Sequence, residues 1–147
     1  MSAPVTAAPL LRSVTVAVPV ERAFEVFTRR IGDWWPLQTH GCFGEQASTV
    51  TLERGVLVER STDGNEAVWG ELLAWEPPTR VAFTWHPGYP DGAAATEVEV
   101  RFHEHGGTTV VELEHRGWER LGSRAGETRA SYASGWPTVL ARYAKAT

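Results

Sequence analysis

The sequence predicts an α+β domain in which an antiparallel sheet of about seven strands packs on a long C-terminal helix. Three observations predict it. With 147 residues, 42% hydrophobic and 22% charged, the chain has the size and composition of one globular domain. Between residues 48 and 116, short segments of alternating apolar and polar side chains follow one another. Residues 127–146 return to helical spacing, and strands followed by a helix are typical of α+β domains.

The N-terminal part is expected to form one strand and two short helices. Alternating valines predict a strand over residues 10–18. Pro19 stops this strand and suits the first turn of a helix over residues 19–30, which Gly32 ends. A second short helix or turn is expected over residues 33–37, where a proline breaks it.

Six further strands are expected after these helices. Asp63-Gly64 and Gly106-Gly107 mark tight turns between strands. Pro77-Pro78 closes a long strand, because proline cannot join a central ladder. The predicted strands cover residues 48–53, 56–61, 66–75, 80–86, 96–103 and 108–116, with a loop over residues 87–95.

The last helix is the only long apolar stripe available to cover the sheet. It follows an irregular segment over residues 117–126 and carries apolar side chains at helical spacing. These are Tyr132, Trp136, Val139, Leu140 and Tyr143. Pro137 either opens a second helical segment or kinks the helix. A curved sheet that grips one helix leaves a space between them, which is a candidate ligand cavity.

Composition and the N-terminus exclude several classes of function. The net charge of −4 argues against nucleic acid as the partner. A single cysteine, Cys42, excludes an internal disulfide and a cysteine-based zinc site. No apolar run approaches the roughly 20 residues that span a bilayer. Residues 1–9 are expected to be a flexible lead-in without a secretory signal, so we expect a cytoplasmic protein with a single domain over residues 10–147.

Four segments resemble a known superfamily. They read PVERAFEVFTRRIGDWWP, VERSTDGNEAVWGELLAWEPPTRVAFTW, LEHRGWERLG and GWPTVLARYA. Over residues 10–146 the chain resembles the START-like, helix-grip superfamily (SRPBCC), and within it the branch named for the activator of the heat-shock-protein-90 ATPase. The resemblance implies a birch-pollen-allergen-like fold, with a curved sheet around the last helix. Members bind lipids, hormones or polyketides, and a few catalyse cyclisation or hydrolysis.

Ten residues are predicted to line the cavity between the sheet and the last helix. Most are aromatic, and Trp69 and Trp85 lie at the centres of alternating strands, where a flat or oily ligand would contact them. The alternative for each tryptophan is core or rim packing, since an indole ring buries a large area. The predicted lining is Trp34, Trp35, Glu59, Trp69, Glu71, Phe83, Trp85, His115, Trp136 and Leu140.

Three members of this set are titratable. Alternation from Trp69 places Glu71 on the face of Leu73 and Trp75. A carboxylate of Glu59 or Glu71 that faced an apolar space would have a raised pKa and could act as an acid or base. The alternative is a solvated carboxylate or one paired with an arginine. His115 continues the inward alternation of its strand, as a structural pin to the last helix or as a polar group of the pocket.

Two other patterns are weighed and set aside. His40 and Cys42 are two residues apart, which could lower the thiol pKa, but no third group orients them. His103 and His105 would share a strand face, but they sit at a hydrated hairpin end without a third ligand. We therefore predict no metal, no cofactor and no catalytic residue.

The leading hypothesis is non-catalytic binding of a small hydrophobic or aromatic ligand by a monomer or homodimer. One alternative is a protein-interaction module whose partner is a chaperone or another protein, and a cavity much smaller than about 300 Å³ would favour it. The other is a cavity acid–base enzyme, such as a polyketide cyclase-like protein, which uses Glu59, Glu71 or His115. Carboxylates that converge with His115 would favour this enzyme.

Overall fold

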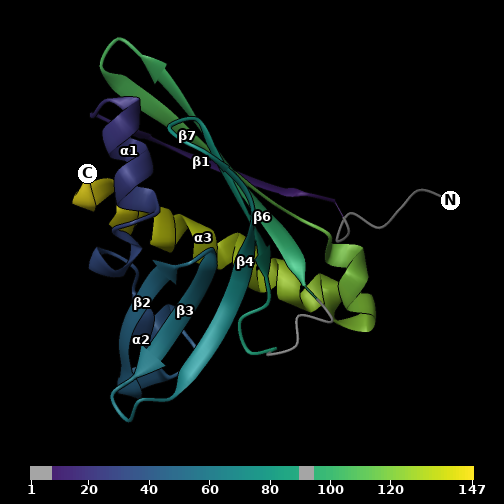
Figure 1. The fold of residues 1–147 in the computed structure, drawn as a ribbon. Helices are drawn as coiled ribbons and strands as arrows, with labels where there is room; N and C mark the ends of the chain where they lie inside the picture. The colour runs from purple at the N-terminus through teal and green to yellow at the C-terminus, as the bar shows by residue number, and fades with distance from the viewer. Residues whose placement is uncertain (1–7, 90–94) are drawn as a thin grey trace, which may run out of the picture.

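Seven strands form one curled antiparallel sheet around a long helix in the computed structural model of the chain, which describes residues 8–89 and 95–147 (Figure 1). The strand order is β1-β7-β6-β5-β4-β3-β2. This arrangement confirms the predicted α+β, helix-grip fold. Residues 1–7 of the expected flexible N-terminus, and residues 90–94 of the expected loop, lie outside the described residues.

The bounds of the elements follow the predicted pattern closely. The strands are β1 Leu10–Val16, β2 Ala47–Glu53, β3 Val56–Ser61, β4 Glu66–Glu76, β5 Arg80–Trp85, β6 Thr96–His105 and β7 Thr108–Arg116. The helices are α1 Val20–Phe27, α2 Leu37–His40 and α3 Ala125–Ala146, with 3₁₀ turns at Ile31–Asp33, Gly44–Gln46 and Trp118–Arg124. The expected second helix therefore lies later than predicted. Pro36 precedes α2 and starts the helix that it was expected to break.

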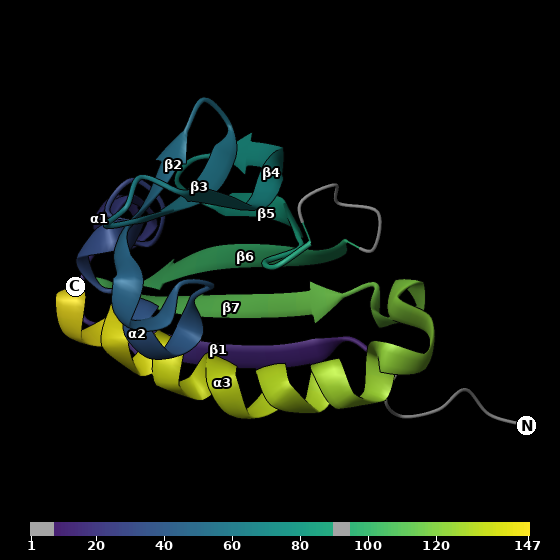
Figure 2. The ribbon, with the colours of Figure 1, turned by 90° about the horizontal axis from the view of Figure 1, so that it is seen from below.

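Helix α3 crosses the inner side of the sheet and closes the core (Figure 2). The predicted apolar stripe is confirmed, because four of its members are buried and Tyr132 packs against the same core. The buried members are Trp136, Val139, Leu140 and Tyr143. The helix runs through Pro137, which lies on its exposed face, so this proline does not divide it. Tyr143 also donates a hydrogen bond to the carbonyl of Ala23 in α1 (2.8 Å).

A β-bulge in β4 changes which side chains face the core. Leu57 of β3 pairs with Gly70 and Val58 pairs with Val68, so Trp69 has no partner on β3. Trp69 points inward, but the alternation that follows it is inverted. Glu71 therefore lies on the outer face, contrary to the alternation drawn from Trp69. Leu73 lies there with it, 53% exposed. A second register shift, between Leu72 and Ala74, returns Trp75 to the inner face, where it pairs with Val81 and its ring lies 5.1 Å from that of Phe24 in α1.

Candidate ligand-binding pocket

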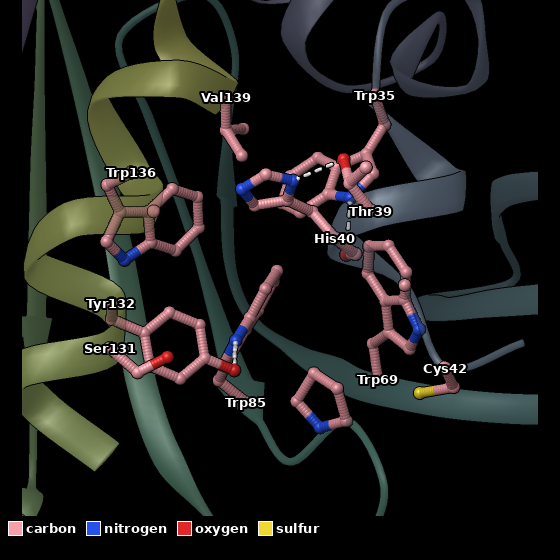
Figure 3. A pocket seen from close by; sticks show the side chains of 13 residues that line it. Trp35, Thr39, His40, Cys42, Trp69, Trp85, Ser131, Tyr132, Trp136 and Val139 are labelled. Atoms are coloured by element: carbon pink, nitrogen blue, oxygen red, sulfur yellow. Dashed lines mark hydrogen bonds between the residues drawn. The ribbon is translucent and has the colours of Figure 1, made fainter. Parts of the chain in front are cut away.

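A cavity of about 290 Å³ lies between α2, strands β4 and β5, and α3 (Figure 3). Four of the ten predicted residues line it, and all four are tryptophans. Its lining comprises Trp35, Thr39, His40, Gly41, Cys42, Trp69, Trp85, Pro87, Ser131, Tyr132, Gly135, Trp136 and Val139. Charged aspartate, glutamate, lysine and arginine side chains are absent from this described lining. The pocket is therefore an aromatic box with a few neutral polar groups on its wall.

The four indole rings of the box are fixed by hydrogen bonds. Each N–H has an acceptor: Trp35 donates to the His40 carbonyl (2.9 Å), Trp69 to Glu59 (3.0 Å), Trp85 to the Tyr132 hydroxyl (3.1 Å) and Trp136 to His115 (3.1 Å). The rings also pack on one another, with centroids from 4.9 Å (Trp35–Trp69) to 6.0 Å (Trp35–Trp85) apart. Because their polar edges are occupied within the protein, the rings offer apolar surface to the cavity.

Glu59 lies behind this wall and holds it in place. Its side chain is fully buried and accepts hydrogen bonds from the backbone N–H of Cys42 (2.7 Å) and Phe43 (3.3 Å), and from the indole of Trp69. The carboxylate thus ties the segment after α2 to the sheet. A Cβ on Gly41 would come within 2.7 Å of a Glu59 oxygen, so this approach requires a glycine. Glu59 does not line the cavity.

His115 is a buried structural histidine beneath the box. Its Nδ1 accepts from the Trp136 indole, so Nε2 carries the ring hydrogen and donates to Thr96 Oγ1 (2.7 Å). Thr96 donates onward to the Trp85 carbonyl (3.2 Å). Burial lowers the pKa of His115 to about 3, so the ring is neutral. These bonds join β6, β7 and α3, as the structural reading of this residue predicts.

The buried state of His115 makes stability depend on pH. The unfolded chain binds a proton on this imidazole below its ordinary pKa of 6.5, whereas the folded chain does so only near 3. The contribution of the neutral His115 ring to the free energy of unfolding is therefore fully present above about pH 6.5. It is lost as the pH drops toward 3, by up to about 1.4 kcal/mol per pH unit. We expect the free energy of unfolding in urea to depend less on pH between 7 and 4 for His115→Gln than for the wild type. His103→Gln, at a half-exposed site, is the control. Equal pH slopes in wild type and His115→Gln would contradict this assignment.

The other predicted residues lie away from the cavity. Trp34, Phe83 and Leu140 are buried in the core, where Trp34 donates to the Val26 carbonyl (2.7 Å). Glu71 faces outward, and Thr84 and His86 lower its pKa by hydrogen bonding. The distances are 2.6 Å from Thr84 Oγ1 and 2.9 Å from His86 Nε2.

Sequence reasoning missed two polar groups of the pocket, His40 and Tyr132. Tyr132 stood on the predicted helical stripe, but His40 was considered only as a partner of Cys42. The histidine instead bonds to Thr39 (2.7 Å). Although Cys42 is an exposed residue, desolvation of its thiol, followed by the nearby Glu59 carboxylate, raises the pKa of Cys42 to about 11. This thiol therefore stays protonated near neutral pH.

Neither a metal site nor a membrane span is found within residues 8–89 and 95–147. No group of three or more histidine, cysteine, aspartate or glutamate side chains is placed to hold an ion there. His103 lies against Glu112 instead (2.7 Å). None of the helices in these ranges is long and apolar enough to cross a bilayer.

Solved structures similar to this chain share its fold. An anthrahydroquino-gamma-pyrone synthase, Txn09, is 38% identical, with a TM-score of 0.66 over 95% of this chain and 96% of the other. The self-sacrificing resistance protein CalC from Micromonospora echinospora is 22% identical (TM-score 0.68, 95% and 94% covered). The Aha1 dimer from Colwellia psychrerythraea is 12% identical (TM-score 0.60, 90% of each chain). The last two likenesses concern the fold alone.

The family assignment rests on nearly the whole chain. Residues 17–146 match the family model described as activator of Hsp90 ATPase homolog 1-like protein. No curated protein matches the chain. The resemblance noted in the sequence is thereby confirmed, and the chain belongs to the family of activator of Hsp90 ATPase homolog 1-like proteins.

Proposed function

We propose that this protein binds a flat, polycyclic aromatic molecule of the polyketide type in the tryptophan-lined pocket. The observation that carries the proposal is the fixed arrangement of four indole rings around one cavity. Preorganised aromatic faces suit a flat ligand, because stacking then requires little further ordering of side chains. The similarity to an anthrahydroquino-gamma-pyrone synthase at 38% identity supports the same class of ligand.

The size of the pocket favours a compact ligand. About 290 Å³ lies near the lower end of ligand pockets, which span roughly 300–1,000 Å³. A few fused rings, or one end of a larger molecule, would occupy it. A protein-interaction module without a ligand would be expected to have a much smaller cavity, whereas this volume lies close to the range of ligand pockets. The likeness to the Aha1 dimer, at 12% identity, adds no argument for a chaperone partner.

A second candidate is a cyclisation reaction on such a ligand. It is favoured by the 38% identical relative, which is named as a synthase and whose length this chain matches almost completely. The acid–base residues considered from the sequence do not support it. Glu59 accepts three N–H groups behind the wall, and both nitrogens of His115 are engaged. A reaction in this pocket would use the polar groups on its wall instead.

Anthraquinone binding tests the proposed function. We expect the wild type to bind anthraquinone saturably, and Trp85→Leu to bind it about tenfold more weakly, because one stacking face is lost. Isothermal titration calorimetry measures both without relying on tryptophan emission. Trp75→Leu is the matched control, since Trp75 packs against Phe24 of α1 and does not line the cavity. Equal affinities in the Trp85 and Trp75 variants would contradict the assignment of the pocket.

A further inference from the structure

Two polar groups on the pocket wall retain hydrogen-bonding capacity that the described residues do not use. One is the Nε2 atom of His40, at the end of α2. The other is the hydroxyl hydrogen of Tyr132, on α3. Figure 3 shows them at separate places on the wall, with the tryptophan rings around them. Their chemistry is complementary, because one accepts a hydrogen bond and the other donates one.

The orientation of the His40 ring is set by its neighbours. Trp35 donates to the His40 carbonyl and so fixes the end of α2. The ring Nδ1 lies 2.7 Å from Thr39 Oγ1, which turns Nε2 away from Thr39 and toward α3 (Figure 3). On that side the helix carries Gly135. A Cβ built on it would lie 3.8 Å from Nε2 and 3.6 Å from Cδ2. The glycine therefore leaves this edge of the imidazole open to the cavity.

The contacts of the Thr39 hydroxyl indicate which ring nitrogen of His40 carries the hydrogen. Thr39 Oγ1 also lies 3.3 Å from the Pro36 carbonyl, to which it can only donate. A hydroxyl has one hydrogen, so it cannot donate to Pro36 and to Nδ1 together. Both contacts exist at once only when the imidazole donates from Nδ1 to Thr39. Nε2 then bears a lone pair, and the pocket contains an acceptor at this position.

Tyr132 supplies the donor. Its hydroxyl oxygen accepts the indole N–H of Trp85 (3.1 Å), and no acceptor within residues 8–89 and 95–147 takes its own hydrogen. Burial raises the pKa of Tyr132 to about 12, so the phenol keeps that hydrogen near neutral pH. The O–H is free to donate into the cavity that the tyrosine lines.

We infer that the pocket selects hydroxylated aromatic ketones, with a phenolic hydroxyl donating to His40 Nε2 and a carbonyl accepting from Tyr132. This inference rests on the proposed function and names its ligand more closely. A flat hydrocarbon would stack on the same rings but leave both polar groups desolvated without partners. Sites built to bond a hydroxyl discriminate strongly against analogues that lack it, for this reason.

A set of naphthalenes separates the contributions of stacking and hydrogen bonding. The probes are 6-acetyl-2-naphthol, its 2-methoxy ether and 2-naphthol, all titrated by calorimetry in the same buffer. We expect the naphthol to bind wild type about tenfold more tightly than the methoxy ether, which cannot donate. We also expect 6-acetyl-2-naphthol to bind more tightly than 2-naphthol, by about fivefold, through the ketone.

Variants assign each preference to one group. His40→Phe keeps a ring but loses Nε2, so the preference for the naphthol over its ether should vanish while the ether binds as before. Thr39→Val keeps the imidazole and removes the hydroxyl that orients it, so the preference should shrink. Tyr132→Phe should remove the preference for the acetyl group only. His103→Phe, on the outer hairpin, is the matched control and should behave as wild type. Melting temperatures verify that each variant is folded.

The outcomes distinguish this inference from the proposed function. If all of the naphthalenes bind wild type with equal affinity, the pocket binds aromatics but the selectivity assigned to His40 and Tyr132 is wrong. If the ether binds more tightly than the naphthol, Nε2 carries the hydrogen and the assigned polarity is wrong. If none binds, both the proposed function and this inference are wrong. An unchanged naphthol preference in His40→Phe would also overturn it.

Discussion

Gly70→Ala is expected to destabilise the domain severely. A Cβ on Gly70 would lie 1.7 Å from the carbonyl oxygen of Thr84 and 2.7 Å from its carbonyl carbon. Both are backbone atoms of the neighbouring strand β5, so no side-chain rotation can relieve the overlap. Strand β4 would have to move away from β5, which would separate Trp69 from Trp85. We expect a loss of more than about 4 kcal/mol, a large part of the 5–15 kcal/mol that stabilises a domain.

Urea unfolding followed by far-ultraviolet circular dichroism measures this effect. Gly135→Ala is the matched control, because its Cβ would meet only the His40 ring, at ordinary contact distances of 3.6 and 3.8 Å. Alanine in a helix interior is favoured over glycine by about 1 kcal/mol, so this control should be at least as stable as wild type. A Gly70→Ala protein that unfolds within 1 kcal/mol of wild type, a difference of about fivefold in the equilibrium constant, would show that β4 and β5 do not approach as described.

The same part of β4 shows where sequence reasoning holds and where it stops. Alternation located the strands β5, β6 and β7, because each pairs with its neighbour in unbroken register. It failed in β4 because the bulge at Trp69 inverts the side chains that follow it and moves Glu71 to the outer face, and a second register shift between Leu72 and Ala74 inverts the pattern again. A bulge has no strong signature in a single sequence. The glycine beside it was the available signal, since glycine in a strand often marks close approach of another backbone.

The residues of the candidate site also divide into those that the sequence could predict and those that it could not. The tryptophans of the pocket could be predicted from strand centres and helical spacing, which are local patterns. The role of Glu59 could not, and that of His115 was predicted only as one of two alternatives, because their partners lie far along the chain. Glu59 bonds to Cys42, 17 residues away, and His115 bonds to Trp136, 21 residues away. Both looked like acid–base candidates from sequence alone. Their hydrogen bonds show that they hold the walls of the pocket.

Loss of the Glu59 carboxylate is expected to destabilise the pocket wall and the whole domain. Glu59→Leu has a similar volume but cannot accept the N–H groups of Cys42, Phe43 and Trp69. Each buried donor left without a partner costs about 1–3 kcal/mol, so we expect a loss of about 3–5 kcal/mol. Glu59→Gln keeps one carbonyl oxygen and should lose about half as much. Glu66→Gln, which affects only an exposed pair with Arg60, should change stability by less than about 1 kcal/mol.

The thiol of Cys42 reports on the same carboxylate without unfolding the protein. Desolvation raises the pKa of Cys42 even though the residue is exposed, and the charge of Glu59 and its hydrogen bond add to the effect. Glu59→Gln removes the charge and frees the segment after α2, so the thiolate becomes easier to form. We therefore expect iodoacetamide to modify Cys42 faster in folded Glu59→Gln than in wild type at the same pH, because the thiolate is the reactive form. Anthraquinone affinity should fall in parallel, as Trp69 loses its anchor. Unchanged stability, thiol reactivity and ligand affinity in Glu59→Gln would show that this carboxylate does not hold the wall of the pocket.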